Sequence, residues 1–254
     1  MVKFKKHSNT LEGPFRHAER LENGDLILRF RTADGQFGSI VRSADGKPAR
    51  KVRPGWQERP TILLSSVKAR GARETESRLE AEACWMFDLD PAVVSYETQP
   101  FTVNYEIDGR TISTYPDIEL KLTSGIFEIA QIKMQSTYEK HLRENPRFRY
   151  ERETFERLGW SYKVMTEIEI RAEPKLSNLK LLRHYRKRPV SQEIMRGVIA
   201  AVGKKPGATI RDVIGAFQAG TLHEVDVFAL IAQHKIRADL SLPIRSDTRL
   251  IASL

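Results

Sequence analysis

Two short apolar runs near the middle of the chain, residues 118–122 and 126–132, predict a β-hairpin. Both runs are rich in aliphatic and β-branched side chains, and the segment 123–125 between them reads Thr-Ser-Gly. A glycine-containing turn between two such runs is typical of a hairpin. The rest of the chain can be understood as support for this element.

Polar side chains on the hairpin should converge. Because successive side chains of a strand point to opposite faces, Asp117 and Glu119 should share one face of the first strand. The same alternation places Gln131 and Lys133 on one face of the partner strand and Glu128 on the other. The hairpin can therefore bring a carboxylate, an amide and an amine together.

A helical period precedes the hairpin. Four apolar residues between 74 and 89 fall at i, i+4, i+7 and i+8, which is one face of a helix. They are Leu79, Ala83, Met86 and Phe87. The Asp-Pro pair at 90–91 then ends the predicted helix.

Three strand-like runs, 93–99, 101–107 and 110–115, lie between that helix and the hairpin. The second run alternates apolar and polar residues, and Asp-Gly at 108–109 signals a tight turn. Because the connections are short, these runs predict an antiparallel meander that directly follows the helix.

The chain beyond the hairpin predicts a return to the sheet. A polar stretch follows Lys133, and a helix begins near Pro146 and ends at Gly159. The run 162–166 then has strand character. A helix that crosses back to a further strand predicts α/β architecture and covers a sheet face.

The two ends of the chain predict smaller elements. Residues 26–30 and 37–41 predict a hairpin, and the basic, turn-rich segment 42–59 predicts an arm that becomes ordered against a partner. Three helical patterns and an alternating segment close the chain: 192–202, 209–217, 223–234 and 237–250. Three short helices and a hairpin predict a winged-helix domain.

Charge changes this picture because it is unevenly distributed. The overall net charge is +9, and the segments 1–72, 73–134, 135–190 and 191–254 carry +8, −7, +6 and +2. Basic flanks suit a polyanion such as DNA, whereas the acidic segment repels it unless cations intervene. The pattern favours metal-mediated contact with phosphates, although such flanks are also ordinary solvated surface.

Composition excludes several other classes. Cys84 is the only cysteine, which excludes an internal disulfide and a cysteine-based zinc cluster and fits a reducing cytoplasm. No apolar run is long enough to span a bilayer, and no apolar block follows the basic N-terminus. We therefore expect a cytoplasmic protein with no membrane partner.

The hairpin residues match the layout of a metal-dependent phosphodiesterase site. Asp117 directly follows a proline, and Gln131 comes fourteen residues later, then one spacer and Lys133. A carboxylate and a carbonyl-type oxygen hold a hard divalent ion, and the lysine brings positive charge to the phosphate. The usual pattern has an acid where Gln131 stands, and an amide oxygen adds no charge. An amphipathic hairpin with a solvated polar face is the alternative.

Glu80 has two explanations. Ser77 and Glu80 match a capping box, in which Glu80 reaches back to the Ser77 backbone N–H. Alternatively, the helix delivers Glu80 as a third metal ligand. Spacing leaves both open, with Glu82 as a competing candidate.

Seven short motifs follow one another across residues 73–170. They are Ser77-Arg-Leu-Glu80, Phe87-Asp-Leu-Asp-Pro-Ala-Val-Val94, Gln99-Pro-Phe101, Tyr105 to Gly109, Tyr115-Pro-Asp117, Gln131-Ile-Lys133 and Trp160 to Glu167. No single motif is decisive, but their order and spacing resemble the TnsA family. Members of that family are the endonuclease subunits of heteromeric cut-and-paste transposases.

The resemblance implies a restriction-endonuclease-like fold of the PD-(D/E)xK superfamily, in which Gln-x-Lys is a known form of the motif. It implies a catalytic set of Glu80, Asp117, Gln131 and Lys133. The first three would be Mg²⁺ ligands, the Ile132 carbonyl would add a ligand, and Mn²⁺ should substitute.

The resemblance also implies partners. The substrate would be double-stranded DNA at transposon ends, cleaved at the 5′ ends of the element. A separate DDE-type transposase subunit would cut and join the 3′ ends, and an AAA+ ATPase regulator would contact the C-terminal domain. The small net charge of residues 191–254 also favours protein docking there.

We therefore predict an α/β protein with a restriction-endonuclease-like mixed sheet flanked by helices and a C-terminal winged-helix domain. The expected divisions are a basic N-terminal arm, a nuclease core, a basic connecting helix and the winged-helix domain: 1–72, 73–170, 171–190 and 191–254. Two other functions remain open, a stand-alone structure-specific DNA nuclease and a non-catalytic DNA-binding adaptor.

Overall fold

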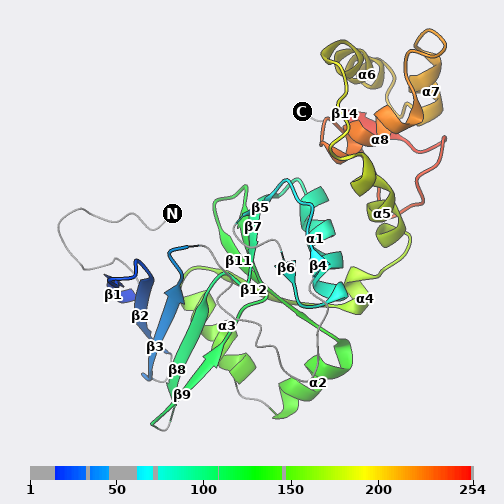
Figure 1. The fold of residues 1–254 in the computed structure, drawn as a ribbon. Coiled ribbons are helices and arrows are strands. Elements are labelled where there is room, and N and C mark those ends of the chain that lie inside the picture. The colour runs from blue at the N-terminus through cyan, green and yellow to red at the C-terminus, as the bar shows by residue number, and fades with distance from the viewer. Residues whose placement is uncertain are drawn as a thin grey trace. The chain divides into compact units, whose positions relative to one another are not determined.

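The computed structural model describes residues 15–32, 35–45, 62–70, 74–107, 109–144 and 147–252. Within these ranges the chain is a mixed α/β protein with eight helices and fourteen strands, as predicted. It divides into two compact units, the first made of residues 1–88 and 92–169 and the second of residues 89–91 and 170–254. Figure 1 shows that most strands belong to the first unit.

Two five-stranded sheets dominate the first unit (Figure 1). One is antiparallel and has the spatial order β1 (Phe15–Arg20), β2 (Leu26–Arg31), β3 (Phe37–Arg42), β8 (Thr102–Ile107) and β9 (Arg110–Thr114). The other is mixed and has the order β12 (Ser161–Thr166), β11 (Phe127–Lys133), β10 (Ile118–Leu122), β7 (Val93–Thr98) and β5 (Ala69–Arg70). A short pair, β4 (Ile62–Leu63) and β6 (Glu74–Thr75), accompanies them.

The predicted N-terminal and central hairpins are present. The N-terminal one is β2–β3, which pairs onward with β8, so residues 15–42 take part in the fold of the first unit. The central one is β10–β11, with Ile118 opposite Ala130. Most of the basic segment expected to be an arm, 42–59, lies outside the described residues.

The predicted antiparallel meander is wrong for its first strand, β7, and right for its other two strands, since β8 and β9 form an antiparallel pair. Strand β7 pairs with β10 and β5, whereas β8 pairs with β3 and β9 in the other sheet. The chain changes sheets at Gln99, where φ is +46°, and Pro100 has no N–H with which to continue a ladder. Alternating side chains identify strands but do not identify their partners.

Helices cover the mixed sheet. Helix α1 (Arg78–Leu89) packs on one face, where the Phe87 ring lies 6.1 Å from the Tyr96 ring and the Lys163 amine lies over it. The predicted apolar face of α1 is buried. Helix α3 (Arg147–Arg157) joins the core that the two sheets share, where Phe155 stacks on Tyr162.

Two helices were not predicted. Helix α2 (Gln135–Glu144) occupies the polar stretch after the hairpin, and the short α4 (Glu167–Ile170) follows β12. No residue of α2 is buried, and Tyr138 and Leu142 are its only large apolar side chains, which is too few to mark a helical face in the sequence.

The second unit is mainly helical. Its elements are α5 (Lys175–Tyr185), α6 (Gln192–Lys204), α7 (Ile210–Gly215), α8 (Glu224–Ala232), β13 (Ile236–Ala238) and β14 (Leu250–Ala252). The last five match the predicted three helices and hairpin, and the winged-helix assignment stays a prediction. Helix α5 falls within this unit and packs on α8, with the Tyr185 and Phe228 rings 5.7 Å apart.

A membrane span is not found in the part of the chain that the structure describes, where every helix is too short or too polar for that role.

Candidate active site

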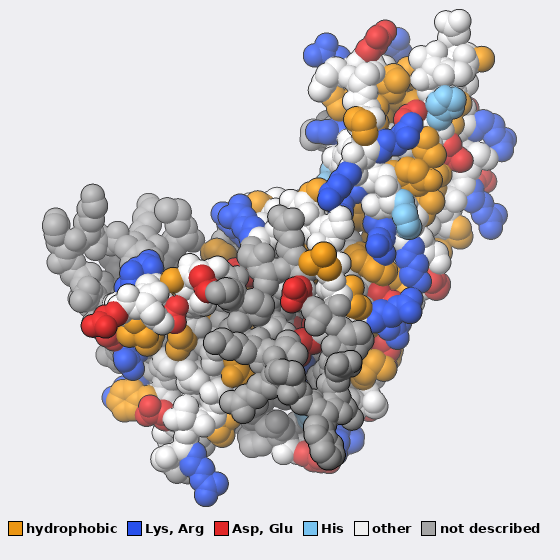
Figure 2. Space-filling model, in the orientation of Figure 1, with side chains coloured by type: hydrophobic (Ala, Val, Ile, Leu, Met, Phe, Trp, Pro, Cys, Tyr) orange, Lys and Arg blue, Asp and Glu red, His pale blue; other side chains and the backbone are white. Residues whose placement is uncertain are grey.

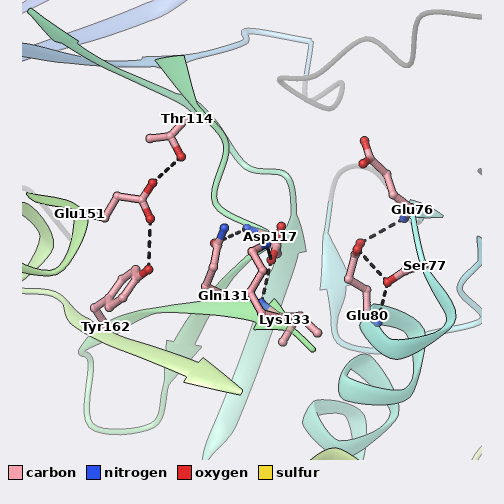
Figure 3. A network of polar contacts seen from close by, with 10 residues as sticks. Glu76, Ser77, Glu80, Thr114, Asp117, Gln131, Lys133, Glu151 and Tyr162 are labelled. Atoms are coloured by element: carbon pink, nitrogen blue, oxygen red, sulfur yellow. Dashed lines mark hydrogen bonds and ion pairs between the residues drawn. The ribbon is translucent and has the colours of Figure 1, made fainter. Parts of the chain in front are cut away.

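Three of the predicted site residues contact one another in the first unit. The Lys133 amine donates to Asp117 Oδ2 at 3.0 Å, and the Asp117 backbone N–H donates to Gln131 Oε1 at 3.1 Å. Figure 3 shows the three side chains gathered at the hairpin. The face alternation predicted for this hairpin therefore brings them together.

The register of the hairpin explains this group. Ile118 pairs with Ala130, so Asp117, directly before β10, falls opposite Gln131. The Ile132 backbone N–H also donates to Asp117 Oδ2, at 2.7 Å. Among the described residues, no donor is bonded to Asp117 Oδ1. One carboxylate oxygen is thus fixed by the partner strand, and the other remains available to a ligand.

Glu80 lies apart from this group, in the first turn of α1. Ser77 Oγ donates to Glu80 Oε1 at 2.9 Å, and the Glu80 N–H donates back to Ser77 Oγ at 3.1 Å. The second half of the predicted capping box is wrong in one respect. The box predicts a hydrogen bond from the Ser77 backbone N–H to the Glu80 carboxylate. Glu80 Oε2 instead accepts from the backbone N–H of Glu76, one residue earlier, at 3.0 Å.

Electrostatics nevertheless link Glu80 to Asp117. Burial raises the pKa of Glu80 from 4.5 to about 7, and the negative charge of Asp117 contributes to this rise. Burial also raises the pKa of Asp117, against the lowering effect of the Lys133 amine. A carboxylate whose ionisation is disfavoured by burial and by a second carboxylate marks a place where a cation would be stabilised. Figure 3 shows them on neighbouring elements, with no hydrogen bond drawn between them.

Gln131 and Ile132 have structural partners in addition to their predicted ligand roles. Gln131 is buried, and its Oε1 already accepts one hydrogen bond, although an amide oxygen has a second lone pair. The Ile132 N–H holds Asp117, and its carbonyl as a ligand stays a prediction. Across the described ranges, no group of three or more His, Cys, Asp or Glu side chains is placed to hold a metal ion.

Glu119, expected on the face of Asp117, has another partner. Its two carboxylate oxygens each accept from Arg42 of β3 at 2.8 Å, and Arg42 also pairs with Glu97 at 3.0 Å. The Arg42 guanidinium lies 5.0 Å from the centre of the Phe101 ring. These contacts tie the two sheets together beside the site.

A buried carboxylate that the sequence did not reveal lies nearby. Glu151 of α3 accepts from Thr114 Oγ1 at 2.6 Å and from the Tyr162 hydroxyl at 3.1 Å. Figure 3 shows this group on the opposite side of Asp117 from Glu80. Its members come from three different elements, and Thr114 lies 37 residues before Glu151, so no local pattern could have found the group.

The remaining candidates are placed elsewhere. Glu128 pairs with Lys163 at 2.7 Å on the face away from Asp117, as predicted. Glu82 is buried against Arg78, which leaves it a structural role. Burial raises the pKa of the Cys84 thiol well above its ordinary value, so this cysteine is a poor nucleophile.

The mixed α/β unit thus joins an aspartate, an amide and a lysine on one hairpin, in the layout expected from the sequence. Residues 90–167 match the family described as TnsA-like endonuclease N terminal. This match confirms the TnsA resemblance, supports assignment to the TnsA family and supports a nuclease activity. It includes Asp117, Gln131 and Lys133 and begins after Glu80. No curated protein matches the chain.

Proposed function

We propose that this protein is a metal-dependent DNA endonuclease that cleaves at the 5′ ends of a mobile element as one subunit of a heteromeric transposase. The observation that carries the proposal is the hydrogen-bonded Asp117–Gln131–Lys133 group inside the segment that matches TnsA-like endonucleases. Glu80 completes the proposed catalytic set. We further propose that the first unit has the restriction-endonuclease-like fold, with β10 and β11 as its catalytic strands.

The donor set fits a hard divalent ion such as Mg²⁺, with Mn²⁺ able to replace it. Glu80, Asp117, Gln131 and the Ile132 carbonyl would hold the ion. All four donors are oxygens, and burial together with the negative charge of Asp117 raises the pKa of Glu80, so a divalent cation at this place would offset the charge of both carboxylates. When bound, the ion would supply Lewis-acid chemistry at the phosphate and at the attacking water.

The chain's own residues would orient the reaction. Asp117 Oδ2 fixes the Lys133 amine, and that amine can donate to the phosphate oxygens on which negative charge grows. Lys133 is only partly buried, so its amine can reach a DNA strand. The Ile132 N–H keeps Asp117 in place and leaves Oδ1 available.

We propose that the second unit is a winged helix that docks a protein, the AAA+ regulator, instead of reading DNA bases. In a winged helix the third helix usually enters the DNA groove. Here the corresponding helix, α8, is buried along 226–232 and packs against α5, which leaves little of it free for DNA. Figure 2 shows basic side chains spread over this unit among apolar ones, without a single continuous stripe on the face shown.

The test is cleavage of a labelled duplex carrying an element end, by the full chain with its neighbouring DDE-type subunit, in Mg²⁺ and in EDTA. The proposal expects a metal-dependent nick at the 5′ end that Asp117→Ala abolishes. Cleavage of branched DNA by the full chain alone would favour a stand-alone nuclease. DNA binding without metal binding would favour an adaptor.

The buried thiol of Cys84 also suits the proposed cytoplasmic location.

A further inference from the structure

Gln99 is a strained residue beside the proposed site. Its φ of +46° lies in the left-handed region, which residues other than glycine, asparagine and aspartate rarely adopt. Pro100 follows and restricts the backbone of Gln99 further. Such strain persists only where the surrounding structure enforces it, and it is frequent at functional sites.

The backbone of Gln99 is bonded directly to Asp117. The Gln99 N–H donates to the Asp117 carbonyl oxygen at 2.9 Å, one position beyond the Thr98–Ile118 pair that ends the ladder of β7 and β10. Gln99 therefore lies at the level of Asp117 in the sheet. Any residue except proline could make this backbone bond, so the bond does not explain why a glutamine occupies the position.

The side chain of Gln99 has a second unusual property. The residue is only 9% exposed, yet no group among the described residues hydrogen-bonds its amide. Polar groups buried to this degree nearly always have a partner, because an unpaired amide loses its hydration without compensation. The residue keeps 9% of its surface exposed, so it is not sealed off from a bound molecule.

We propose that Gln99 is a substrate-binding residue whose side-chain amide donates a hydrogen bond to a phosphate oxygen of the DNA strand at Asp117. The inference rests on the proposed nuclease function. The amide suits this ligand because it offers two donors and no charge beside two carboxylates. The strained backbone of Gln99 then serves binding, because it holds the amide donor at the edge of the site.

The test compares full-length wild type with Gln99→Gly and Gln99→Ala. Glycine relieves the strained φ and alanine retains it, and both remove the amide. The chain offers a matched control, His234→Gly, because His234 is the other described non-glycine residue with positive φ and lies in the second unit. Fluorescence anisotropy with a labelled duplex in Ca²⁺ measures affinity, and cleavage in Mn²⁺ measures KM and kcat.

Both Gln99 variants should bind the duplex roughly 10-fold more weakly, as expected for a lost hydrogen bond to a charged group. KM should rise with a smaller change in kcat, while Gln99→Gly melts no lower than wild type. His234→Gly should bind DNA like wild type. Unchanged affinity and KM in Gln99→Gly would overturn the inference, and so would an equal loss in His234→Gly. Wild type that does not cleave, or Asp117→Asn that cleaves normally, would instead remove the proposed function on which it rests.

Discussion

The two halves of the proposed site are built differently. Asp117, Gln131 and Lys133 are held by contacts among themselves and with the backbone of the partner strand. Glu80 comes from a helix, and both its oxygens are bonded to the start of that helix. A sheet can prearrange a site through register alone, whereas the helix residue serves both its own cap and the site.

Breaking the hairpin half should have the largest effect. Asp117→Asn keeps the size of the side chain but removes one of two carboxylates, and we expect strand cleavage to fall by about 1000-fold or more. DNA binding, measured without metal, should change little. Glu128→Gln is the control, because Glu128 pairs with Lys163 on the opposite face. Normal cleavage by Asp117→Asn would take Asp117 out of the site.

Removing the amine should have the next largest effect. Lys133→Ala leaves the proposed ligands in place but removes the charge that Asp117 orients, and cleavage should fall by about 100-fold. Single-turnover cleavage of a labelled duplex measures this. Lys121→Ala, an exposed change on the same hairpin, should cleave normally. An equal loss in both variants would point to general charge instead of a placed amine.

The free energy of unfolding should depend on pH through Glu80. Folding favours its protonated form, since its pKa is raised from 4.5 to about 7. This stabilisation is fully present below about pH 4.5 and is lost as the pH rises through about 7. Metal-free wild type should therefore lose up to about 3 kcal/mol relative to Glu80→Gln over this window. Chemical denaturation at several pH values measures the difference, and parallel curves would contradict the shift.

Metal binding separates the two uses of Glu80. If Glu80 is a metal ligand, the Glu80→Gln variant should bind Mn²⁺ roughly 10-fold more weakly than wild type in calorimetric titrations. If Glu80 only caps the helix, the Glu80→Gln variant should melt at a lower temperature than wild type and bind Mn²⁺ with the same affinity.

The cap itself should give the smallest effect. Ser77→Ala removes the side chain that accepts from the Glu80 N–H, and we expect a loss of about 1 kcal/mol in the free energy of unfolding. Thermal melting measures this, and Mn²⁺ affinity should stay near that of wild type. If Mn²⁺ affinity falls as far as in Glu80→Gln, Ser77 holds Glu80 for the ligand as well as for the helix.

Local patterns predicted what depends on neighbouring residues in the chain. The apolar face of α1 and the alternation in β10 and β11 depend on spacings of a few residues, and each follows from the sequence. The grouping of Asp117 with Gln131 and Lys133 follows from the same alternation, because one tight turn joins the two strands.

Pairing over long distances could not be predicted in this way. β8 joins β3, which lies some sixty residues earlier, and a single strained residue redirects the chain toward it. Glu151 contacts Thr114 of one sheet and Tyr162 of the other, so this group depends on how the two sheets pack. α2 was missed for another reason, since it buries nothing and its sequence resembles a loop.

The place of β3 beside β8 has a practical consequence. A chain trimmed to the segment that matches known endonucleases would lose β1, β2 and β3 and leave one side of β8 with unpaired backbone groups. Open strand edges recruit other chains, particularly beside residues as apolar as Val103. Such a fragment should aggregate before it could be assayed, so β1, β2 and β3 protect the rest of the first unit from association with other chains.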